Sequence, residues 1–197
     1  MVKFAISGKA NSGKNTAAQF LGWKFIGRGK PEPAILDNFK IIAFADPMKE
    51  MVMKMYPETD PEVLWGPSHL RMTKVPNTDI TYRQLLTDLG KLGRGYNPNV
   101  WVDATIAMAN NYANKGIIPI IADCRFKNEL FTLKEKGFFT IRTIRPNNPY
   151  QQHLMAQDIS EIDLDDVADA TFDAVIINDG SLEHLEQKIS DMVKIHF

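Results

Sequence analysis

The sequence predicts an α/β protein built around a mainly parallel sheet. Short apolar runs alternate along the chain with stretches of helical periodicity, which is the pattern of βα units. The length of 197 residues suits one domain, or one domain with a small insertion. Hydrophobic residues make up 44% and charged residues 24%, an ordinary balance for a globular protein.

The first part of the chain is expected to form two strands and then a series of helices. Apolar runs predict strands over 2–7 and 39–44. Apolar residues at helical spacing predict helices over 14–25, 47–55, 81–94 and 100–115. The proline-rich stretch 57–78 has weak periodicity, so we expect an excursion with one short helix.

The remaining elements complete a set of five strands and about seven helices. Residues 117–122 form the most apolar run and are placed at the centre of the sheet. Further strands are predicted over 138–144 and 174–178, and further helices over 127–136 and 182–195. The polar, acidic stretch 147–170 is expected to be an irregular flap.

Composition excludes several functional classes. The formal net charge is −1, from 23 basic and 24 acidic residues, so we expect no direct nucleic-acid partner. The single cysteine, Cys124, excludes an internal disulfide and a cysteine-cluster zinc site. No apolar run approaches the roughly 18 residues of a membrane span, and the first residues lack the apolar core of a signal peptide. We therefore expect a cytoplasmic protein with no membrane partner.

The strongest local signal is a glycine-rich loop between the first strand and the first helix. Gly8 and Gly13 let the backbone curl so that its N–H groups can surround phosphate oxygens, and Lys14 adds a mobile charge. The alternative is an ordinary glycine-rich turn. The predicted strand before the loop and the helix after it favour a phosphate-binding loop over this alternative. The candidate ATP-binding residues of this loop are Gly8, Asn11, Ser12, Gly13, Lys14, Asn15 and Thr16.

A magnesium site is expected beside the phosphates. Asn15 stands where the motif usually has Ser or Thr, and Thr16 follows, so either side chain could reach the Mg²⁺ shell. Asp123 ends the central strand, at the edge where ligands bind in open α/β sheets. The alternative for Asp123 is a strand-end cap paired with Arg125 at the surface.

Arginines and aromatic residues supply further candidates. Phosphoryl transfer needs several cations, and planar guanidinium groups suit it. The candidates are Arg83, Arg94, Arg125, Arg142 and Arg145, two or three of which are expected to face the cleft. Phe44 and Trp101 could stack on a base, although core packing is favoured for both.

Taken in order, these motifs resemble the bacteriophage-type deoxynucleoside monophosphate kinases, a branch of the P-loop nucleotide kinases. The resemblance runs from Lys3 to about Ile189. It rests on the loop from Gly8 to Thr16, Phe44-Ala45-Asp46-Pro47-Met48-Lys49, Tyr82-Arg83-Gln84-Leu85-Leu86, Asp123-Cys124-Arg125-Phe126-Lys127-Asn128-Glu129, Arg145-Pro146, His153 with Ser160-Glu161, and Ile177-Asn178-Asp179-Gly180-Ser181-Leu182.

The resemblance implies a fold and an activity. The fold is a three-layer αβα P-loop NTPase domain over 1–197, with a parallel sheet of order 2-3-1-4-5, an NMP-binding excursion at about 45–100 and a lid at about 146–170. The activity is transfer of the γ-phosphoryl group of ATP, with Mg²⁺, to a deoxynucleoside 5′-monophosphate for DNA synthesis. The compartment would be the host cytoplasm if the source is a virus, and a homodimer is left open.

The resemblance also assigns roles. The catalytic residues would be Lys14, Arg83, Arg125 and Asp123, with Arg145 and Asn178 on the ATP side. Substrate-binding residues would be Phe44, Lys49, Arg83, Arg94, Trp101, Arg125 and Glu129, and lid residues Arg145, His153 and Glu161. Thr87 and Lys91-Leu92 depart from the usual pattern, so no base is named. The alternatives are a P-loop kinase of another acceptor, such as dephospho-coenzyme A, or a non-catalytic NTP-binding module.

Overall fold

A computed structural model of the chain describes residues 1–26, 38–148 and 159–197. These residues form two compact units. The first unit consists of Met1–Ala43 together with Ile106–Phe197, and the second consists of Phe44–Thr105. Each unit has its own hydrophobic core. None of the helices in the described ranges has the length and apolar character needed to cross a membrane.

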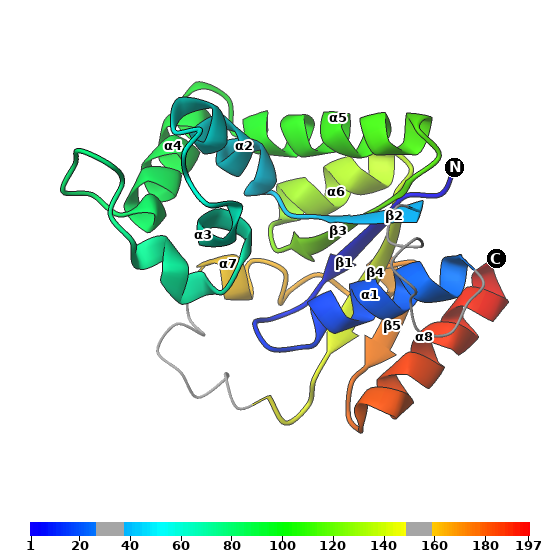
Figure 1. Ribbon diagram of the computed structural model, residues 1–197. Coiled ribbons are helices and arrows are strands. Elements are labelled where there is room, and N and C mark those ends of the chain that lie inside the picture. Colours follow the sequence, from blue (N-terminus) through cyan, green and yellow to red (C-terminus); the bar gives the residue numbers. More distant parts are fainter. Residues whose placement is uncertain (27–37, 149–158) are drawn as a thin grey trace. The chain divides into compact units, whose positions relative to one another are not determined.

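The first unit contains a five-stranded parallel sheet in the order β2-β3-β1-β4-β5 (Figure 1). This confirms the all-parallel arrangement and the order 2-3-1-4-5. The strands are β1 (Phe4–Ser7), β2 (Phe39–Ile42), β3 (Ile118–Cys124), β4 (Phe139–Ile144) and β5 (Ala174–Ile177). The prediction that residues 117–122 form the central strand was wrong, because β1 is the middle strand and β3 lies beside it. All residues of β1 are buried, and it pairs with a strand on either side.

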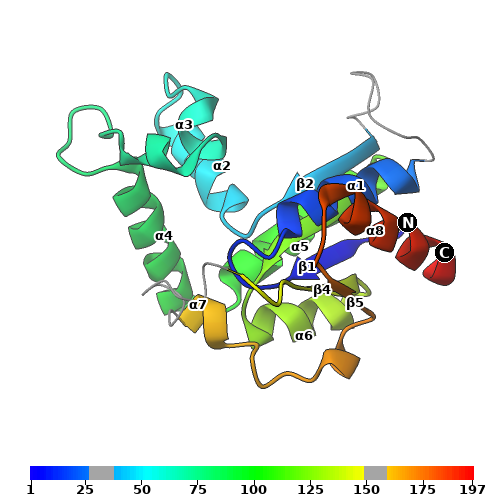
Figure 2. The same cartoon turned by 90° about the horizontal axis from the view of Figure 1, so that it is seen from below.

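Helices cover both faces of this sheet (Figure 2). On one face α1 (Lys14–Phe25) packs against α8 (Leu182–His196). On the other lie α6 (Lys127–Glu135) and the end of α5 (Val100–Asn114), a helix that begins in the second unit. The apolar runs that predicted the strands fill the core between these layers, since Phe4, Ile120 and Ile141 are fully buried.

The parallel sheet brings several predicted site segments to one edge. Ser7 pairs with Cys124 on one side and with Arg142 on the other, so the ends of three strands lie together. The Asn178 N–H donates to the Ile144 carbonyl at 2.7 Å, which places the end of β5 at the same edge. The glycine-rich loop, Arg125 and Arg145 therefore leave the sheet as neighbours.

The second unit is helical, and its structure differs from the prediction for residues 57–78. It contains α2 (Asp46–Met55), α3 (Pro61–Trp65), a 3₁₀ helix (Ser68–Met72) and α4 (Tyr82–Tyr96). We expected one short helix in 57–78, but the structure has two short helical segments there. The first is set by local chemistry, because Asp60 accepts the N–H of Glu62 at 2.9 Å and Pro61 suits a first helical position.

The predicted flap also contains regular structure where it is described. A four-residue helix, α7 (Ile159–Ile162), and a 3₁₀ helix (Asp169–Thr171) replace the expected irregular chain. The described ranges therefore hold eight α-helices, one more than predicted. Residues 149–158 of the predicted lid, including His153, lie outside the described residues. Strand β2 ends at Ile42 rather than at 44, because the chain turns into α2.

Candidate functional site

The loop between β1 and α1 depends on glycine at both ends. Gly8 has a φ of 148° and Gly13 a φ of 94°, a region that glycine tolerates and other residues avoid. A Cβ atom on Gly13 would lie 2.5 Å from Nδ2 of Asn178, and one on Gly8 would meet the carbonyl oxygen of Thr143. The loop therefore needs glycine for space as well as for its backbone angles.

Side chains of Thr143 in β4 and of Asn178, just after β5, hold the base of this loop. The Thr143 hydroxyl donates to the Ser7 carbonyl at 2.9 Å and lies 3.0 Å from the Ser12 hydroxyl, all within the core. The Asn178 amide donates to the Ser12 carbonyl at 3.0 Å. Asn178 was predicted on the ATP side, and it lies directly against the loop.

Two residues beyond β4 bind the outer part of the loop. The buried Asn148 amide donates to the Ala10 carbonyl at 2.6 Å. The Arg145 guanidinium donates to the Asn11 carbonyl at 3.2 Å. Donors from outside the loop therefore hold the carbonyls of Ala10, Asn11 and Ser12, which fixes the course of its backbone.

Lys14 lies inside the curl of the loop. Its ammonium group donates to the carbonyl oxygens of Gly8 and Lys9, each at 2.7 Å, and the residue is 8% exposed. Burial, followed by the charge of Arg125, lowers the pKa of Lys14 to about 8, while Asp123 acts in the opposite direction. The predicted phosphate-binding lysine is therefore buried near a second cation.

That second cation is paired with a carboxylate of α7. The guanidinium of Arg125 forms an ion pair with Glu161, whose side chain is only 5% exposed. The other carboxylate oxygen of Glu161 accepts the N–H of Ala10 at 2.6 Å. Lys9 makes a further, partly exposed ion pair with Asp165 at 2.8 Å. The segment after the undescribed residues is thus bound to the glycine-rich loop at two points.

The Glu129 side chain accepts hydrogen bonds from the backbone around Arg125. Its carboxylate accepts the N–H groups of Arg125 at 2.7 Å and Phe126 at 3.1 Å, at the start of α6. Burial raises the pKa of Glu129 to about 8, against the lowering effect of those hydrogen bonds. We predicted Glu129 as a substrate-binding residue, and in the structure its contacts hold the turn that carries Arg125. Burial likewise raises the pKa of the Cys124 thiol.

The residues predicted near magnesium are all at least partly accessible to solvent. Asn15 is exposed, and Thr16 and Asp123 are half-buried. The described ranges contain no group of three or more His, Cys, Asp or Glu side chains that could hold a metal ion. Mg²⁺ is commonly bound through one or two protein groups plus phosphates and water, and the magnesium role of these residues stays a prediction.

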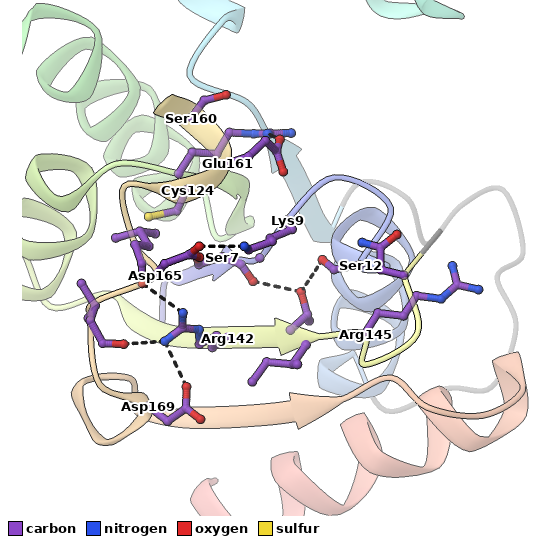
Figure 3. A pocket seen from close by; sticks show the side chains of 17 residues that line it. Ser7, Lys9, Ser12, Cys124, Arg142, Arg145, Ser160, Glu161, Asp165 and Asp169 are labelled. Carbon is purple, nitrogen blue, oxygen red and sulfur yellow. Dashed lines mark hydrogen bonds and ion pairs between the residues drawn. The ribbon is translucent and has the colours of Figure 1, made fainter. Parts of the chain in front are cut away.

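A cavity of about 360 Å³ lies beside the loop, within the first unit (Figure 3). Lys9, Ser12 and Arg145 line one part of it, and Arg142 lines another. Arg142 is already engaged, because it donates to the carbonyls of Val167 at 2.6 Å and Leu164 at 3.0 Å and to Asp169 at 3.0 Å. Arg142 thus anchors the cavity wall.

Three predicted substrate residues of the second unit have packing partners there. Phe44 is 7% exposed. Lys49 forms an ion pair with Asp46 at 2.9 Å and lies 5.6 Å from the ring of Trp65. The Trp101 indole N–H donates to the Gly90 carbonyl at 3.1 Å, which agrees with the packing role favoured for this tryptophan.

Two predicted arginines of the second unit lie at opposite ends of α4. Arg83 is in its first turn and Arg94 in its last, and both side chains are exposed. Arg71, which the sequence did not single out, is brought near Arg83 because the Tyr82 N–H donates to the Thr73 carbonyl at 3.1 Å. Burial and the charge of Arg83 lower the pKa of Arg71.

Several residues of the site escaped sequence reasoning. Thr143, Asn148 and Asp165 contact the glycine-rich loop but belong to no motif with a fixed spacing. Only their order in the chain could have pointed to them, because Thr143 lies near the end of β4 and the other two residues follow that strand. A comparison with protein-family models finds no match, and a comparison with curated proteins finds none either.

Proposed function

We propose that this chain is an ATP-dependent deoxynucleoside monophosphate kinase with a P-loop NTPase fold. The observation that carries the proposal is the loop Gly8–Gly13, curled around Lys14 at the carboxyl edge of a parallel sheet of order 2-3-1-4-5. A glycine-rich loop that opens a helix is a preferred site for the phosphates of a nucleotide.

The roles follow from the chemistry of the side chains. Lys14 and the loop amides would hold the β- and γ-phosphates of ATP, with Mg²⁺ supported by Asp123 and by Asn15 or Thr16. Bound Mg²⁺ would neutralise charge on the phosphates during transfer. Arg125, close enough to Lys14 to lower its pKa, would stabilise charge on the transferred group.

The acceptor would be a monophosphate because the second unit offers arginines that could pair with its phosphate group. Arg83 carries an exposed guanidinium in the first turn of α4. Because the N-terminal end of a helix stabilises anions, a phosphate group bound there would interact favourably with both the helix and Arg83. Arg83 with Arg71 nearby would suit a dianionic 5′-phosphate. A neutral hydroxyl acceptor would leave such arginines without a partner.

The test is a coupled assay of ADP release with purified protein, ATP and Mg²⁺. Each deoxynucleoside monophosphate is supplied in turn, with free nucleosides and dephospho-coenzyme A as comparison acceptors. We expect ADP release with at least one monophosphate and none with nucleosides. Turnover with dephospho-coenzyme A alone would replace the proposed acceptor, and no turnover with any acceptor would contradict the kinase assignment.

A further inference from the structure

Glu161 joins two groups that are suited to binding phosphate. One carboxylate oxygen accepts the N–H of Ala10 at 2.6 Å, and the other accepts from the guanidinium of Arg125. The side chain is 5% exposed, so its charge depends on these two partners for compensation. The carboxylate therefore bridges the glycine-rich loop and the end of β3.

The same two donors would serve a phosphate group. A loop amide and a guanidinium are standard partners of phosphate oxygens, and a carboxylate presents two oxygens in a comparable way. Lys14 lies close by, and the charge of Arg125 lowers its pKa. Glu161 consequently compensates the charge of Arg125, the cation that lies near Lys14.

We propose that Glu161 is an internal counter-ion that competes with nucleotide phosphate for the Ala10 amide and the Arg125 guanidinium. Phosphate binding then displaces the carboxylate and releases α7. This inference rests on the proposed function only in taking ATP as the ligand of the loop. The inference adds a way to regulate that site, because the affinity for nucleotide would depend on the free energy needed to break the contacts of α7.

The neighbouring contacts limit how far this release extends. Arg142 holds the carbonyls of Leu164 and Val167, so the chain beyond α7 stays attached to β4. Lys9 and Asp165 form an additional ion pair, with side chains 35% and 46% exposed. Asp163 accepts the N–H of Lys127 at 2.7 Å, so the displaced segment is α7 itself, which carries Glu161.

The test is a calorimetric titration of ATP with Mg²⁺, and separately of inorganic tripolyphosphate, without an acceptor. Glu161→Gln keeps the shape of the side chain and removes its charge. The matched control is Asp166→Asn, which removes one charge from the same segment but pairs with the exposed Lys127 at 2.7 Å. We expect Glu161→Gln to bind both ligands roughly tenfold more tightly, within the usual range of coupling between sites. The control should stay within about twofold of the unaltered protein.

Unchanged or weaker binding by Glu161→Gln would overturn the inference. If that variant does not fold, hydrogen exchange of the unaltered protein decides, because exchange at 159–163 should rise when ATP is added. Unchanged or slower exchange there would overturn the inference. ATP binding with no transfer to any monophosphate would remove the proposed function alone, and no ATP binding at all would remove both.

Discussion

Arg125 and Arg142 hold neighbouring parts of one segment in different ways. Arg142 donates to two main-chain carbonyls and to Asp169, and its guanidinium lies 5.1 Å from the ring of Phe172. Arg125 is bound by one carboxylate, that of Glu161. Main-chain carbonyls within a folded segment cannot easily withdraw, whereas a single side chain can rotate away. Arg142 is therefore held mainly by main-chain groups, whereas the pairing of Arg125 depends on one side chain that a ligand could displace.

The largest expected effect concerns Arg125. We expect Arg125→Ala to lower kcat/KM for the monophosphate, by an amount that corresponds to a loss of about 2–4 kcal/mol of transition-state stabilisation. The reason is the loss of a charge that would pair with phosphate. Saturation kinetics with the monophosphate measure this effect. Arg125→Lys should recover only part of the loss, since an ammonium lacks the forked geometry. Kinetics that are unchanged in both variants would place Arg125 outside the reaction site.

The next effect concerns the anchor. We expect Arg142→Ala to lower the free energy of unfolding by about 2–3 kcal/mol, because several acceptors lose a charged donor. Denaturant unfolding with and without ATP measures it, and the deficit should be the same in both conditions. A deficit that disappears with ATP would mean that Arg142, too, makes an exchangeable contact.

A smaller effect concerns the pH dependence of ATP affinity. Lys14 has a pKa of about 8 in the free protein, and bound phosphates would raise it. Above pH 8, ATP binding is then accompanied by the uptake of one proton by Lys14. The affinity for ATP should therefore fall as pH rises, by at most about tenfold per pH unit for this one proton. Glu129, with a pKa also about 8, gains negative charge over the same range and acts in the same direction.

Titrations at several pH values separate the two groups. Lys14→Gln should flatten most of the slope and Glu129→Gln a minor part, because Lys14 lies in the loop itself. A slope that Lys14→Gln leaves intact would assign the proton to another group.

The smallest effect concerns the exposed partner of Arg142. Asp169 has a side chain that is 58% exposed, so its ion pair is screened by solvent. We expect Asp169→Asn to change stability by less than about 1 kcal/mol. Thermal unfolding next to Arg142→Ala measures the contrast. A loss equal to that of Arg142→Ala would show that the ion pair, rather than the carbonyls, fixes the segment.

The sheet and the glycine-rich loop were predictable because their signals are local. Apolar runs placed all five strands to within a few residues, and Gly8, Gly13 and Lys14 stand at a fixed spacing. The contact between Ala10 and Glu161 could not be predicted, since 151 residues separate the two. The engagement of Arg142 was also unforeseen, because charge pattern does not reveal which arginine binds carbonyls.

The most direct test of the account is γ-phosphoryl transfer from ATP to a monophosphate by Lys14→Ala. Lys14 supplies a charge inside the loop, and losing a cation that stabilises the transition state should lower turnover by about 100-fold or more. The account predicts this loss in a variant that keeps its cooperative unfolding transition. Turnover within about twofold of the unaltered protein, from a variant equally well folded, would contradict the assignment of the loop to phosphate binding.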